Sequence, residues 1–235
     1  MNKLILFLVL SSMKLSAQNN LGTWNVTNVN FKANEKWNVF AEAQLRSLSF
    51  YDEFHYYEYK GGLTYKITPN FSATTGVGSY NTFSEGGNFE QPMQNKEIRT
   101  WVQINMKNPL EWISFEHRYR AEQRFTSNGY RNRFRYRLAA TVPLNSKKIA
   151  PKTVYALFWD EIFFTNIEPY FERNRLFLGG GYEFSKNLAF QMGYIYQFDY
   201  KINDETGRDF LNLSILYNFD LSKSKQNGFI PAISD

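Results

Sequence analysis

The sequence has 235 residues, of which 43% are hydrophobic and 18% aromatic, and a formal net charge of +5. No stretch approaches the roughly 20 apolar residues that a spanning helix needs, which excludes a helical-bundle membrane protein. The aromatic content argues against disorder. The absence of cysteine excludes disulfides, thiolate zinc sites, a cysteine nucleophile and a lipid anchor on cysteine.

Residues 1–17 have the layout of a secretory signal peptide. Lys3 precedes the unbroken apolar run 4–10, and Ser16 and Ala17 form a small-residue end. Cleavage after Ala17 leaves 25 basic and 22 acidic side chains, and this near balance argues against nucleic-acid binding. The chain is therefore expected to be exported.

Apolar and polar side chains then alternate in about eleven successive segments. A period of two is typical of strands with one apolar and one polar face. In chain order the clearest segments are 36–50, 56–67, 96–107, 111–125, 130–142, 188–198 and 211–219, and the count of eleven includes residues 22–32. Within 130–142, Arg133 and Arg135 alternate with Phe134 and Tyr136, so a strand would align the arginines on one face.

The predicted strands of roughly 11–14 residues exceed the usual 5–6 and match the about 9–11 that a tilted strand needs to cross a bilayer. Short turns are expected near 33–35, 68–70, 108–109 and 185–187, and longer polar connections near 82–95, 126–129, 164–171 and 201–208. Such alternation is typical of outer-membrane barrels. Residues 143–151 break it, because they are too long for the short side.

Two all-β folds fit this pattern. A soluble lipocalin-like barrel has an apolar interior, whereas a transmembrane barrel has an apolar exterior. The signal peptide and the strongly charged polar faces favour the transmembrane barrel, and so do aromatic residues placed near strand ends: Trp24, Trp37, Tyr65, Trp101, Trp112 and Tyr217.

We therefore predict an all-β, antiparallel, transmembrane up-and-down barrel of about 10–12 strands over residues 18–220, followed by a tail at 221–235. It is expected to be a porin-like monomer in the outer membrane of a Gram-negative-type envelope. Bacterial single-chain barrels have even strand numbers. Either 22–32 lies outside the closed sheet, leaving ten strands, or one segment splits to give twelve.

Charged residues on the polar faces form the candidate site. We expect the lumen to be lined by Glu42, Arg46, Glu58, Glu97, Arg99, Glu116, Arg118, Arg120, Glu122, Arg124, Arg131, Arg133, Arg135, Arg137, Asp160, Arg173, Arg175 and Glu183. Like charges on neighbouring strands destabilise a sheet, so the arginines of 111–125 and 130–142 need carboxylates from across the barrel. The candidates for this role are Glu42, Glu58, Glu97, Asp160 and Glu183. The set is either a structural ion-pair network that fills the lumen or an anion-attracting pore.

The histidines and serines do not favour catalytic chemistry. A barrel-embedded lipid hydrolase would need a serine beside a histidine, but Ser114 and His117 have opposite strand parity. His55 and His117 are the only histidines, which argues against a metal cluster. We predict no enzyme activity, no metal and no cofactor.

Several short motifs resemble one family. They lie at Trp24, at Gln44 and Arg46, and at 61–65, 116–120, 131–133, 160–161, 171–182, 185–187 and 193–197. Their order is similar to that of the domain of unknown function 2490 family over residues 22–220. The resemblance implies an outer-membrane barrel of unassigned role and no catalytic residues. The partners expected of such a barrel are outer-membrane lipid, the barrel-assembly machinery and small anions. Phe219 resembles the aromatic that ends outer-membrane barrels, although further residues follow it.

Overall fold

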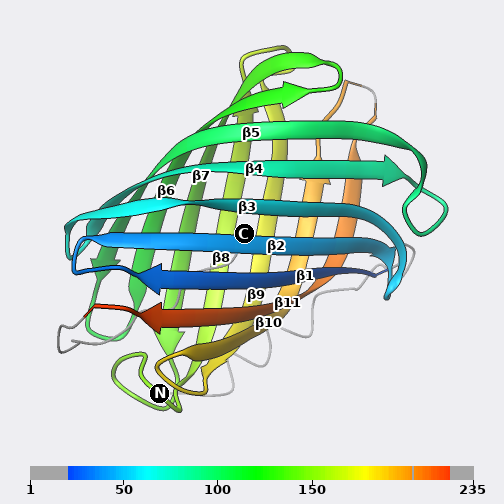
Figure 1. Ribbon diagram of the computed structural model, residues 1–235. Coiled ribbons are helices and arrows are strands. Elements are labelled where there is room, and N and C mark those ends of the chain that lie inside the picture. The colour runs from blue at the N-terminus through cyan, green and yellow to red at the C-terminus, as the bar shows by residue number, and fades with distance from the viewer. Residues whose placement is uncertain (1–20, 203, 223–235) are drawn as a thin grey trace.

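The computed structural model describes residues 21–202 and 204–222, which form a closed β-barrel of eleven strands without a helix (Figure 1). The strands are β1 (Gly22–Lys32), β2 (Trp37–Ser49), β3 (Asp52–Thr68), β4 (Phe71–Ser84), β5 (Glu90–Pro109), β6 (Ser114–Thr126), β7 (Gly129–Pro143), β8 (Val154–Thr165), β9 (Phe171–Glu183), β10 (Leu188–Asp199) and β11 (Thr206–Asp220). The expected all-β barrel is confirmed. Among these residues, none forms a helix that is long and apolar enough to cross a membrane.

The barrel closes through a parallel pair. Each strand pairs antiparallel with its neighbour in sequence, but β1 pairs with β11 in parallel, from Gly22 opposite Phe210 to Lys32 opposite Asp220. In an up-and-down chain with an odd number of strands, the first and last strands run in the same direction, so their pairing has to be parallel. The predicted antiparallel closure is therefore wrong at this one seam. Eleven strands lie within the predicted range of about 10–12, but neither way of reaching an even number is correct. β1 belongs to the closed sheet, and the described residues form eleven strands, so no segment has split to give a twelfth.

The two faces of the wall have opposite chemistry. On β7, Arg133 and Arg135 are 3% and 7% exposed and point inward, whereas Phe134 between them is 51% exposed on the outer wall. The same alternation is found on β5, where Val102 is exposed outside and Glu97 is buried inside. Most of the outer wall is thus apolar, while much of the interior is charged.

A second part of the interior is apolar. Its cluster, here called the apolar cluster, consists of Trp24, Val26, Ala139, Tyr155, Leu157, Trp159, Phe177, Ile195 and Phe210. These side chains come from β1 and from β7 to β11. Trp24 and Trp101 were expected near the strand ends with the interfacial aromatics, but both are buried inside the barrel. Trp37 and Trp112 are exposed, as expected.

The connections do not follow the expected alternation of short and long. Residues 85–89 alone connect β4 to β5, because these strands extend into the segment expected as a long loop. The longest connection, residues 144–153, joins β7 to β8 at the end where short turns were expected. It folds inward, with Thr153 buried and Ile149 packed against the apolar cluster.

The predicted signal peptide at 1–17 lies outside the described residues, as does the tail beyond Ser222.

Candidate functional site

The structure brings nearly all of the predicted lumen residues onto the inner face. Fourteen of them are buried there: Glu42, Arg46, Glu58, Glu97, Arg99, Arg118, Arg120, Glu122, Arg124, Arg133, Arg135, Arg137, Arg175 and Glu183. Glu116, Arg131 and Arg173 are half-buried and stand opposite inward residues in the strand register. We call the inward charged residues the charged network.

Asp160 does not belong to this network. It stands opposite Leu138 on β7 and Leu176 on β9, which places it on the outer face, where its Oδ1 accepts a hydrogen bond from Asn174 at 2.6 Å. Its neighbour Glu161 takes the inner position and is 1% exposed. Sequence reasoning chose the wrong member of this pair because both faces of β8 are apolar, so hydrophobicity alone does not give the parity of this strand.

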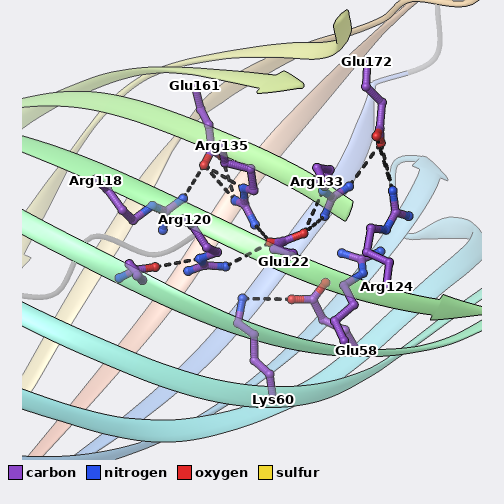
Figure 2. Close-up of polar contacts among 12 residues, drawn as sticks. Glu58, Lys60, Arg118, Arg120, Glu122, Arg124, Arg133, Arg135, Glu161 and Glu172 are labelled. Carbon is purple, nitrogen blue, oxygen red and sulfur yellow. Dashed lines mark hydrogen bonds and ion pairs between the residues drawn. The ribbon is translucent and has the colours of Figure 1, made fainter. Parts of the chain in front are cut away.

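Two carboxylates form the centre of the charged network (Figure 2). Glu122 on β6 accepts hydrogen bonds from Arg133 Nε at 2.7 Å and from Arg135 Nη1 at 2.8 Å. Glu161 on β8 accepts from Arg118 Nη2 at 2.5 Å and from Arg135 at 2.9 Å. Each carboxylate is therefore shared by two guanidinium groups. Charge-assisted contacts of this kind are the strong class of protein hydrogen bonds.

A second group extends the network along the lumen. Glu97 accepts from Arg99 Nε at 2.6 Å and also from Arg124. Glu172, which sequence reasoning missed, lies 3.2 Å from both Arg124 and Arg133 and connects this group to the centre (Figure 2). Glu172 is only the second residue of β9, where the alternating pattern is too short to assign a face.

The β2 and β3 side carries its own pairs. Lys60 Nζ lies 2.6 Å from Glu42 and 3.0 Å from Glu58, and Arg46 lies 3.3 Å from Glu58. Glu42 and Glu58 were expected to serve the arginines of β6 and β7, but they pair with these nearer cations instead. Lys60 was not anticipated, although its parity in 56–67 is that of Glu58.

Arginines do stand opposite one another, as the hairpin of β6 and β7 predicts. The register places Arg118 opposite Arg137 and Arg120 opposite Arg135. Glu161 pairs with Arg118 and Arg135, and Glu122 pairs with Arg135 and lies 3.7 Å from Arg120. Glu116 lies 3.8 Å from Arg137. Aromatic rings add to such pairing: the guanidinium carbon of Arg99, which also binds Glu97, lies 3.7 Å from the centre of the Tyr80 ring. Such contacts add about 0.5–2 kcal/mol each.

The described part of the buried interior has an excess of positive charge. The buried cations are Arg46, Lys60, Arg99, Arg118, Arg120, Arg124, Arg133, Arg135, Arg137 and Arg175; the buried carboxylates are Glu42, Glu58, Glu97, Glu122, Glu161 and Glu183. Glu183 pairs with no arginine: neither of its oxygens has a hydrogen-bond partner among the described residues, and Ala189 stands opposite it.

The histidines lie apart from this network. His117 is on the outer face, where Nδ1 is 2.9 Å from the Tyr136 hydroxyl. Ser114 stands opposite Thr141 in the register and shares the inner face with Glu116. His55 is buried on β3. Within residues 21–202 and 204–222 no group of three or more His, Asp or Glu side chains is placed to hold a metal ion.

The fold and the site define a closed β-barrel with a charged interior and a mainly apolar outer wall. The chain belongs to a protein family of unknown function, DUF2490, and the sequence model of this family matches residues 21–208. No curated protein matches the sequence, and no solved structure matches the fold.

Proposed function

We propose that the chain is an integral outer-membrane β-barrel whose charged interior restricts passage to small solutes, with a preference for anions. The observation that carries this proposal is the chemistry of the two faces. Phe134 is half exposed on the outer wall while Arg133 and Arg135 beside it are buried. In water an apolar outer wall is unfavourable, whereas in lipid it is what a barrel needs.

Aromatic side chains at the strand ends support a membrane setting. At one end, Trp37 and Tyr65 have ring centres 4.8 Å apart, and Trp112 is 67% exposed. At the other end, the rings of Phe125 and Tyr130 are 5.2 Å apart on the outer wall. Aromatic belts of this kind lie at the two interfaces of membrane barrels.

The interior supports a restricted passage. Buried ion pairs lie on the inner faces of β2, β3 and β5 to β8, so we propose no route for large solutes. The excess of arginine favours anions over cations, since rings of Arg and Lys select anions in pores. The partners of this role are outer-membrane lipid, the barrel-assembly machinery during insertion and small anions, and the barrel acts as a monomer.

Cell fractionation and gel mobility test the membrane setting. The protein is expected in the outer-membrane fraction, and it should migrate differently on a gel before and after boiling. A chain of residues 18–235 that stays soluble and folded without detergent would instead favour a soluble binding barrel.

Planar-bilayer recording tests the passage. We expect small currents whose reversal potential in a salt gradient indicates anion selectivity. No conductance over a wide salt range would leave a structural role for the barrel. A lipid hydrolase is not favoured, because Ser114 and His117 lie on opposite faces of β6. Lipase activity that is lost in His117→Ala would overturn that judgement.

A further inference from the structure

Among the buried arginines of the described residues, Arg175 alone has no carboxylate partner. It is 5% exposed on β9, and its Nε donates to Gln197 Oε1 at 2.8 Å. No carboxylate of a described residue lies within 4.0 Å of its guanidinium nitrogens. Glu161 stands opposite Arg175 in the register, but that carboxylate is already bound by Arg118 and Arg135.

Its terminal nitrogens are available. Arg175 Nη1 and Nη2 donate to no described residue, and they are not among the fully enclosed polar atoms that lack a partner. The group is therefore buried as a whole, yet its two outer donors still face accessible space inside the barrel.

The surroundings of Arg175 compensate its charge only in part. The neighbouring cations Arg173, Arg46 and Arg135 each repel it more strongly than Glu161 attracts it. Its guanidinium carbon lies 4.8 Å from the ring centres of both Trp24 and Phe163. Arg46 lies against the same indole at 3.3 Å, and Arg46 Nε is buried without a partner among the described residues. Aromatic faces attract a cation but do not neutralise it.

Arginine does not lose its proton in proteins, so this charge cannot be removed by titration. A buried charge without full compensation is unfavourable, and a ligand of opposite charge removes the penalty. We propose that Arg175, assisted by Arg46, binds a small oxyanion, a carboxylate or a phosphate, beside the Trp24 indole. The planar fork of Arg175 matches two oxygens of such an anion.

This proposal deepens the anion preference proposed above and rests on it for its role in transport. The site itself requires only the closed barrel, so the two proposals fail separately. If the anion site is absent, membrane fractionation and the boiling shift are unchanged and the membrane proposal stands. If the protein is instead a soluble barrel, the membrane proposal fails but the interior can still bind the anion.

Thermal unfolding of the full-length protein in detergent micelles tests the site. Phosphate or acetate is added from zero to a few millimolar, with chloride keeping the ionic strength constant. We expect the unfolding temperature of the wild type to rise by several degrees and to saturate, as mass action requires for a ligand of the folded state. Whichever of phosphate and acetate gives the larger rise in unfolding temperature is the preferred oxyanion.

Arg175→Met is expected to lose this response, because it removes the charge and the fork while keeping a long side chain. The matched control is Arg208→Met, which removes a rim cation that pairs with Glu85 at 2.5 Å. That variant should respond like the wild type. Arg175→Lys keeps the charge without the planar fork and should need about tenfold more anion.

The absence of a saturable response in the wild type overturns the proposal, and so does an unchanged response in Arg175→Met. If Arg175→Met does not fold, the wild type and Arg175→Lys decide. A Lys variant with the wild-type response shows that the fork of Arg175 does not hold the anion.

Discussion

The interior of the barrel has two regions that are built from the same strand geometry with opposite chemistry. In the apolar cluster, the rings of Trp159 and Phe177 stack with centres 5.3 Å apart, and shape decides how well they fit. In the charged network, Glu122 is 2% exposed and binds two arginines, so the stability of this region depends on charge pairing. The apolar region should therefore be sensitive to volume, whereas the charged region should be sensitive to the loss of a single charge.

The two regions meet at stacked arginines. Arg46 and Arg175 lie against Trp24, and the Arg137 guanidinium carbon lies 5.6 Å from the centre of the Trp159 ring. Guanidinium is weakly hydrated and planar, so it packs on an aromatic face while its edge still donates hydrogen bonds. Arginine can therefore form this boundary where lysine could not.

The largest effect is expected for Glu122→Gln, a nearly isosteric change in the charged network. It leaves Arg133 and Arg135 short of one negative charge in a buried site, which should cost about 3–5 kcal/mol of unfolding free energy. Urea titration in lipid vesicles measures it. The double variant with Arg135→Met should recover part of the loss, and a simple sum of the two single effects would contradict the pairing.

Gly179→Ala tests the sensitivity of the apolar region to volume. A Cβ at this position of β9 would lie 2.4 Å from the carbonyl oxygen of Met192 and 2.7 Å from the Phe177 ring. Overpacking of this kind costs about 1–3 kcal/mol. The same titration measures the cost, and a neutral result would show that the two strands separate there without penalty.

Leu157→Met is the matching change in the apolar cluster, because it conserves side-chain volume as Glu122→Gln does in the charged network. Leu157 is 2% exposed, and a swap that conserves volume should cost less than about 1.5 kcal/mol. Urea titrations of both variants give their losses of unfolding free energy. The loss in Glu122→Gln divided by that in Leu157→Met measures how much more sensitive the charged network is than the apolar cluster. Equal costs would show that the charged network is no more demanding than the apolar cluster.

The smallest effect is expected for Glu85→Gln at the rim. Its pair with Arg208 is partly exposed to solvent, and pairs of this kind contribute about 0–1 kcal/mol. This variant removes one carboxylate just as Glu122→Gln does, so it serves as the control for the change in total charge. A loss as large as that of Glu122→Gln would show that burial is not what makes the network sensitive.

The sequence predicts most strands and the faces of some. On β6 and β7 the arginines alternate with Phe and Tyr, so the inner face is visible from the pattern alone. On β8 both faces are apolar, and Asp160 was placed inside in place of Glu161. The parallel seam of β1 and β11 follows from the odd number of strands, which the eleven alternating segments indicate and the expectation of an even number set aside. The individual partners, such as Glu172 with Arg124, depend on closure and register, and local alternation contains no information on either.

The measurement that tests the central claim most directly is the environment of position 134. The chain has no cysteine, so Phe134→Cys can be labelled selectively with a fluorophore in lipid vesicles. Glu35→Cys, in the exposed turn after β1, is the matched control. Lipids brominated in their acyl chains should quench the label at 134 and leave the label at 35 bright. Equal, weak quenching at both positions, with free access of iodide from water to position 134, would contradict a lipid-facing outer wall.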